Sequence, residues 1–235
     1  MSIAIENCAV ATMAGLAYSD GHVVVEGNRI AAVGPGPART PGIDRRIDAS
    51  GRLATPGLIN CHHHLYQWAT RGHAQGATLF EWLEELYPVW ARVDERVERA
   101  AARAGLATLL MSGCTTASDH HYVFPRDAGD LFAVEVEAAR ELGVRFNPCR
   151  GSMDLGRSAG GLPPDSIVED RDAILAAYDD VLSRFHDPAP GSMCRVALAP
   201  CSPFSVSREL MMDSAELARA RGVRLHTHMA ETVEE

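Results

Sequence analysis

The sequence lacks the features of a membrane or exported protein. No apolar run approaches the roughly 20 residues that a membrane-spanning helix needs. The N-terminus has no basic segment followed by a long apolar stretch, so we expect no signal peptide. Basic residues are also in deficit, because 22 Lys and Arg stand against 31 Asp and Glu and give a formal net charge of −9. This balance disfavours binding to a nucleic-acid backbone, which requires clustered cations.

The cysteines show no pattern of a disulfide framework. All six are scattered along the chain, and none belongs to a Cys-x-x-Cys pair. Free thiols in a reducing compartment are the simpler interpretation, so we expect a cytoplasmic protein. With 235 residues, 46% hydrophobic and 23% charged, the chain has the composition of an ordinary globular protein with a sizeable core.

Several well-known catalytic motifs are missing. The chain contains no His-Glu-x-x-His, no Gly-x-Ser-x-Gly and no P-loop. The His-x-Glu and Pro-Cys-x-x-Cys pair of the smaller zinc deaminases is absent as well. A Gly-x-Gly at residues 34–36 contains one proline, is followed directly by another and leads into no helical pattern, so it does not predict a phosphate loop.

Residues 1–55 are predicted to form a small β domain. Short β-like runs cover residues 3–5, 22–26 and 29–33, and Gly27-Asn28 between the last two is a hairpin signal.

From residue 56 to residue 235 the pattern changes to short apolar strands that alternate with amphipathic segments of helical length. Five strands are expected, near residues 58–60, 114–119, 144–147, 195–199 and 223–226. The helices are expected near residues 78–90, 94–112, 127–142, 167–185 and 207–221. Polar or reactive side chains follow each strand, which is typical of a parallel α/β sheet whose sites form at the carboxyl ends of the strands.

A (β/α)₈ barrel is the preferred architecture, and a doubly wound sheet is the alternative. A complete barrel takes about 250 residues, and fewer than that follow residue 56. With five strands visible, we expect a barrel that is truncated after about its fifth strand.

The residues that carry chemistry are histidines at strand ends. Because side chains alternate along a strand, His62 and His64 share one face and His63 faces the other. His226 and His228 end the fifth strand, which faces the first across the mouth of a barrel. The triplet alone would favour a solvated or core cluster, but the second pair favours a site for Zn²⁺ or Fe²⁺.

Glu231 lies three residues after His228 and can reach the same mouth. A divalent metal would lower the pKa of a bound water to near neutrality, and a nearby carboxylate could pass a proton to a leaving group. The residues therefore predict metal-assisted hydrolysis.

The combined motifs resemble those of the amidohydrolase superfamily. Pro-Gly-Leu-Ile-Asn-x-His-x-His at residues 56–64 and His-Thr-His-Met-Ala-Glu-Thr at residues 226–232 carry this resemblance. Further strings are similar to the aminohydrolase branch, which deaminates purines, pyrimidines and triazines, and they lie at residues 62–67, 112–120, 150–153 and 160–166.

The resemblance implies one divalent metal bound by His62, His64 and His228, with Zn²⁺ as the first choice and Fe²⁺ as the alternative. It implies that Glu231 is the catalytic residue that transfers protons. By the same resemblance, Gln67 matches a position that contacts the base, although a surface amide is nearly as good an interpretation.

Three more substrate contacts are predicted from position alone. Arg150, Cys201 and His120 end strands and should line the mouth, and each also has a purely structural interpretation.

The implied reaction is the hydrolytic deamination of a purine-like heterocycle, with 8-oxoguanine giving urate and ammonia as the first candidate and a hydroxy-s-triazine as the alternative. The superfamily also has a histidine after strand six, an aspartate after strand eight and C-terminal strands that complete the β domain as a composite sandwich. None of these is found here, so a metal-binding but inactive fragment is a further alternative. The expected partners are the small heterocyclic substrate and, in a homo-oligomer, further copies of the chain, with no nucleic acid or membrane.

Overall fold

The computed structural model describes residues 1–233, so the last two residues of the domain predicted for 56–235 lie outside the described part. The chain divides into two compact units, Met1–Gly57 and Leu58–Glu235. This division falls two residues beyond the boundary expected after residue 55.

The N-terminal unit is a five-stranded mixed sheet organised around its first strand. Its strands are β1 (Ser2–Ala11), β2 (Ala17–Glu26), β3 (Arg29–Pro35), β4 (Arg45–Asp48) and β5 (Leu53–Ala54). β1 pairs antiparallel with β2 and parallel with both β4 and β5. The predicted hairpin between β2 and β3 is confirmed, and its Gly27 has a φ of 59°, which glycine adopts without steric cost.

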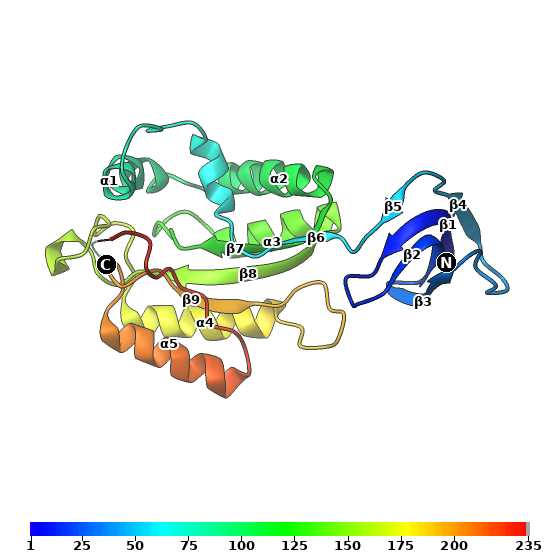
Figure 1. Ribbon diagram of the computed structural model, residues 1–235. Helices are drawn as coiled ribbons and strands as arrows, with labels where there is room; N and C mark the ends of the chain where they lie inside the picture. Colours follow the sequence, from blue (N-terminus) through cyan, green and yellow to red (C-terminus); the bar gives the residue numbers. More distant parts are fainter. Residues whose placement is uncertain (234–235) are drawn as a thin grey trace. The chain divides into compact units, whose positions relative to one another are not determined.

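The C-terminal unit contains a four-stranded parallel sheet (Figure 1). Its strands are β6 (Leu58–Asn60), β7 (Cys114–His121), β8 (Arg145–Ser152) and β9 (Ala197–Pro200). They lie side by side in the order of the sequence, β6-β7-β8-β9. A doubly wound sheet reverses its strand order at a switch point, and the described strands show no reversal. The order is that of a barrel wall.

Helices connect these strands, and a side-chain cap precedes each of α2, α3, α4 and α5. They are η1 (Leu65–Thr70), α1 (Leu79–Trp90), α2 (Glu95–Met111), α3 (Leu131–Leu142), η2 (Arg157–Ala159), α4 (Arg171–Phe185) and α5 (Arg208–Arg221). The carboxylates of Asp130 and Asp170 accept N–H bonds at the starts of α3 and α4. These caps explain why both helices begin about four residues later than predicted. None of the helices within residues 1–233 is long and apolar enough to cross a membrane.

The fifth predicted strand, near residues 223–226, forms only a single parallel bridge between Leu198 and Leu225. Two hydrogen bonds make this bridge: Leu198 N–H donates to the Arg224 carbonyl at 3.0 Å, and His226 N–H donates to the Leu198 carbonyl at 2.9 Å. The prediction of a regular strand is therefore wrong within the described residues, yet its parallel alignment with β9 is present. That alignment delivers the following histidine to the end of β9.

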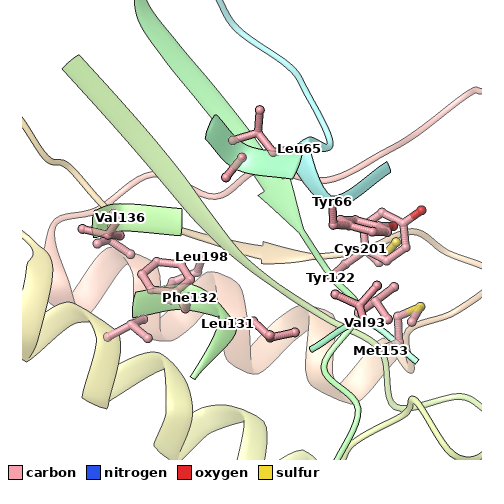
Figure 2. Packing of buried hydrophobic residues seen from close by; sticks show 14 of the residues in the cluster. Leu65, Tyr66, Val93, Tyr122, Leu131, Phe132, Val136, Met153, Leu198 and Cys201 are labelled. Carbon is pink, nitrogen blue, oxygen red and sulfur yellow. The ribbon is translucent and has the colours of Figure 1, made fainter. Parts of the chain in front are cut away.

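Aromatic residues pack the segment after β6 against the end of β7. The Tyr66 ring packs edge to face against the Trp90 ring, with ring centroids 5.3 Å apart, and against the Tyr122 ring, with centroids 5.6 Å apart. Figure 2 shows Tyr66 and Tyr122 close together beside Cys201. Tyr66, Trp90, Tyr122 and Cys201 are all buried. The segment with the strand-end histidines is therefore packed against a well-filled hydrophobic core.

We predict that Gly151→Ala destabilises the fold. A Cβ at Gly151 in β8 would lie 2.6 Å from the Cα atom of Tyr122, and backbone cannot move aside as a flexible side chain can. Overpacking of this kind costs about 1–3 kcal/mol, and thermal unfolding should report a lower Tm. Gly76→Ala is the matched control, because a Cβ there has no neighbour within 4 Å. An unchanged Tm for Gly151→Ala would contradict the close approach of β7 and β8.

Candidate metal centre

The end of β6 presents its histidines on opposite sides. His62 and His64 turn toward the same side, with their Nε2 atoms 3.1 Å apart. His63 points elsewhere: its Nε2 accepts the indole N–H of Trp68 at 3.3 Å, and the two rings stack. The alternation expected from the sequence is therefore present, although the histidines follow the last residue of the regular strand.

The structure brings His228 to the same place from the other end of the unit. Its Nε2 lies 3.1 Å from the Nε2 of His64, across a sequence separation of 164 residues. His228 is held at the end of β9 because its own N–H donates to the Cys201 carbonyl at 2.9 Å. The three histidines predicted as metal ligands thus form one cluster.

Backbone carbonyls determine which nitrogen of two histidines carries the proton. The Nδ1 of His64 lies 2.7 Å from the His120 carbonyl, and the Nδ1 of His228 lies 2.7 Å from the Cys201 carbonyl. A carbonyl only accepts, so each Nδ1 donates and each Nε2 of the neutral ring carries a lone pair. Two lone pairs then face each other at 3.1 Å, an arrangement that a cation between them would stabilise.

The third histidine, His62, has a partner in His226 that can accept the Nδ1 proton of His62 and so leave a lone pair on the Nε2 of His62. The Nδ1 of His62 lies 3.0 Å from the Nε2 of His226, whose Nδ1 lies 3.3 Å from the Cys149 thiol. If His62 donates through Nδ1, its Nε2 also points its lone pair into the cluster. For metal–nitrogen bonds of about 2.0–2.1 Å in a tetrahedral site, ligand nitrogens lie about 3.3 Å apart, close to the observed spacing. The donor set therefore fits a divalent metal.

The environment favours the neutral form of the His62, His64 and His120 imidazoles. Burial, followed by the neighbouring His228, lowers the pKa of His62 from 6.5 to about 4. Burial also holds the pKa values of His64 and His120 well below the usual range. Neutral imidazole is the form that binds a metal.

His120 joins the cluster rather than facing an open mouth. Its ring is fully buried and stacks on the His228 ring at 4.5 Å. Its Nε2 lies 3.2 Å from the Ala199 carbonyl, while its buried Nδ1 has no hydrogen-bond partner among the described residues. Ligand atoms of His62, His120 and His228 lie within 4.8 Å of one another. His120 is thus a fourth nitrogen beside the site, and its burial does not favour the predicted substrate contact.

Gln67 is the predicted substrate contact that lies best for its role. It lines a cavity of about 520 Å³ together with His62, His64, Trp68 and Trp82. Its side-chain N–H donates to the hydroxyls of Tyr66 at 3.3 Å and Tyr122 at 3.4 Å. A cavity of this size with aromatic walls is typical of small-molecule sites.

Arg150 is directed elsewhere. Its guanidinium forms two hydrogen bonds with the Glu169 carboxylate, at 2.7 and 3.0 Å, and stacks over the Phe124 ring at 3.5 Å. It lines a different cavity, which it shares with Glu169 and Phe124. Since its donors are committed to a bidentate ion pair, the geometry gives no support to the predicted substrate contact.

Cys201 contributes through its backbone. The side chain is buried, and burial is the main reason that the pKa of its thiol is raised to about 12. Its carbonyl, by contrast, orients His228. The predicted contact between the thiol and a substrate is therefore not favoured by the geometry, and the residue matters for a reason that its side chain does not reveal.

Glu231 lies close to the same region and is exposed. Burial raises the pKa of Tyr122 well above its usual value, and the charge of Glu231 adds to that effect; it acts in the same direction on Cys201. Tyr122 in turn packs against the His64 ring at 5.1 Å. The carboxylate is therefore near the histidine cluster.

The comparisons with known proteins agree with this geometry. The model of the amidohydrolase family matches residues 53–235. The chain therefore belongs to the amidohydrolase family, and its parallel sheet and helices are part of the (β/α)₈ barrel of that fold class. The preferred architecture is thereby confirmed.

Two curated relatives are similar over nearly the whole chain. The 8-oxoguanine deaminase of Pseudomonas aeruginosa is 44% identical over 229 residues, which cover 97% of this chain and 51% of the relative. The hydroxydechloroatrazine ethylaminohydrolase of a Pseudomonas species is 38% identical and covers 93% of this chain and 48% of the relative. The chain thus spans about half the length of the curated relatives it matches.

A solved structure extends the likeness to three dimensions. The atrazine chlorohydrolase of Arthrobacter aurescens, complexed with zinc, superposes with a TM-score of 0.93 at 35% identity. The match covers 98% of this chain and 53% of that one.

We predict that acid destabilises the metal-free protein through the histidine cluster. The folded pKa of His62 is about 4 against 6.5 in an unfolded chain, so the unfolded state binds more protons between these values. The stability contributed by the neutral ring is complete above pH 6.5 and is lost as the pH falls toward 4. Urea unfolding at pH 7.5 and pH 5 should show this loss. His62→Asn should lose less on acidification, and an equal loss in both proteins would contradict the assignment.

Proposed function

We propose that the whole protein is a metal-dependent aminohydrolase that cleaves a C–N bond of a heterocycle. The observation that carries this proposal is the convergence of imidazole lone pairs, oriented by backbone carbonyls, at the carboxyl ends of parallel strands. The deaminases and hydrolases among the relatives support the reaction class.

We assign His62, His64 and His228 as the ligands of one divalent metal, with Zn²⁺ as the first choice and Fe²⁺ as the alternative. A divalent metal held by these residues would supply Lewis-acid chemistry that activates water for attack. The Arthrobacter aurescens structure contains zinc, which supports the first choice.

Of the other residues, one transfers protons and three contact the heterocycle. We assign to Glu231 the transfer of a proton from the attacking water to the leaving nitrogen, which its electrostatic effect on Tyr122 and Cys201 supports. Gln67 offers an amide to the heterocycle, and Trp68 and Trp82 give its planar ring apolar surfaces in the 520 Å³ cavity.

We propose 8-oxoguanine as the substrate, with water giving urate and ammonia. The similarity to an 8-oxoguanine deaminase supports it, and the similarity to an ethylaminohydrolase of a triazine keeps hydroxy-s-triazines as the second candidate. A cytoplasmic location stays a prediction, supported by six cysteines that are all unpaired.

The metal assignment predicts that His64→Ala loses the bound metal. His64 Nε2 is the atom that lies 3.1 Å from both other Nε2 atoms, so its removal opens the centre of the cluster. Elemental analysis of the purified protein measures the loss. His63→Ala is the control, because His63 faces Trp68, and it should retain the metal. Full metal content in His64→Ala would refute the ligand set.

The substrate assignment predicts a higher kcat/KM for 8-oxoguanine than for guanine or a hydroxy-s-triazine, because a site that hydrogen-bonds a polar group rejects analogues that lack it. Ammonia release measures all three. A tenfold preference for the triazine would move the protein to the second candidate. Metal binding without any turnover would support the inactive alternative.

A further inference from the structure

A group of four ionisable side chains lies buried behind the histidine cluster and has no role in the chemistry above. Glu98 comes from α2, Asp119 and His121 from β7, and Glu135 from α3, and each has no exposed surface. The charged side chains that shift the pKa values of Asp119, His121 and Glu135 are members of this same group, and the buried Cys149 thiol of β8 adds to the effect on Glu135. Three buried carboxyl groups in one place would repel one another strongly if all were ionised.

Asp119 connects this group to residues 63–65, the segment that carries His64 and that we call the metal-site segment. One of its oxygens, Oδ1, accepts the backbone N–H of Leu65 at 2.5 Å. Its other oxygen, Oδ2, is buried and accepts no hydrogen bond from a donor within residues 1–233. The same is true of both carboxyl oxygens of Glu135. The Asp119 and Glu135 side chains lie within hydrogen-bonding reach of each other. Buried acceptors without donors are rare and costly, so a proton between these two carboxyl groups is the simplest way to satisfy them.

The electrostatics agree with that geometry. Burial, followed by the charges of Asp119 and Glu98, raises the pKa of Glu135 well above its ordinary value. Burial raises the pKa of Asp119 to about 7, while a hydrogen bond from Glu135 opposes the rise. Glu135 is thus the member of the pair that keeps its proton, and Asp119 is the anion that accepts it.

The other two residues form a separate pair. The Nε2 of His121 donates to the Val123 carbonyl at 2.8 Å, and its Nδ1 lies 3.6 Å from the Glu98 carboxylate. Burial lowers the pKa of His121, but Glu98 and then Asp119 outweigh it and the net pKa is raised. A protonated imidazole therefore offsets the charge of Glu98, although both Glu98 oxygens and the His121 Nδ1 have no hydrogen-bond partner within residues 1–233 and Glu98 still acts on Glu135.

The acid pair reaches the metal-site segment through a short hydrogen-bonded connection. Residues 63–65 and 119–120 are linked by three bonds: His120 N–H to the His63 carbonyl at 2.8 Å, His64 Nδ1 to the His120 carbonyl at 2.7 Å, and Leu65 N–H to Asp119. Asp119 closes this set on the side away from the cluster.

We propose that Asp119 and Glu135 share one proton and act as positioning residues, with the anionic Asp119 holding segment 63–65 so that His64 is aimed into the histidine cluster. The link to metal binding rests on the proposed function. A charge-assisted bond from a backbone N–H to a carboxylate is roughly twice as strong as a neutral one, and the proton of Glu135 lets that carboxylate remain buried as an anion.

The shared proton is tested first, by infrared spectroscopy of the chelator-treated protein at pH 8.5, above the pKa of about 7 of Asp119. We expect the C=O stretching band of one protonated, buried carboxylic acid. Glu135→Gln should abolish the band, and the matched variant Glu98→Gln should keep it. Ligand atoms of Glu98, His121 and Glu135 lie within 4.8 Å of one another, so a cation there is the competing explanation. A spectrum without an acid band, or a second equivalent of metal that Glu98→Gln removes, overturns the proposal.

The positioning role is tested by zinc affinity, measured by competition with a chelator. We expect Asp119→Asn and Glu135→Ala to weaken zinc binding about 10- to 100-fold, the range found when groups supporting a ligand are lost. Glu135→Gln should restore near-normal affinity, because its amide still donates to Asp119. Wild-type affinity in Asp119→Asn overturns the positioning role. Absence of zinc binding by the wild type would instead refute the proposed function, and the infrared result would still stand.

Discussion

Two hydrogen bonds from imidazoles to backbone carbonyls determine what this molecule can bind. Because the Nδ1 atoms of His64 and His228 donate to His120 and Cys201, their Nε2 lone pairs must face each other. Without those bonds the same rings could turn or exchange tautomers, and the cluster would be three histidines in loose contact. His120 lies near the end of β7 and Cys201 directly follows β9, so the carboxyl edge of the parallel sheet supplies the groups that orient these imidazoles.

The apolar packing around the sheet serves that arrangement. The buried rings of Tyr66 and Tyr122 pack against the His64 ring, with centroid separations of 6.4 and 5.1 Å. The same low-dielectric surroundings lower the pKa values of His62, His64 and His120 and raise those of Asp119 and Glu135. Burial thus favours a neutral His64 on one side of β7 and a protonated Glu135 on the other.

The sequence could predict the parallel sheet and the meeting of His62, His64 and His228, because strand periodicity and strand-end position are local signals. The starts of α3 and α4 were less predictable, since the helical pattern extends past the caps Asp130 and Asp170. Arg150 shows a different limit: its partner Glu169 lies outside its strand, and no local pattern reveals which acid an arginine meets. Glu98 and Glu135 escaped notice because acids on amphipathic helices are normally solvated.

The Cys201 carbonyl accepts the N–H of His228, its Nδ1–H and the hydroxyl of Thr227. Every amino acid brings a carbonyl, so a change of side chain at position 201 leaves this anchor in place. The support of the His228 imidazole therefore tolerates substitution at position 201, while His228 itself cannot be replaced without losing the imidazole. Position 201 is free to drift among residues that fit the core, and the feature it provides leaves no signature in a sequence.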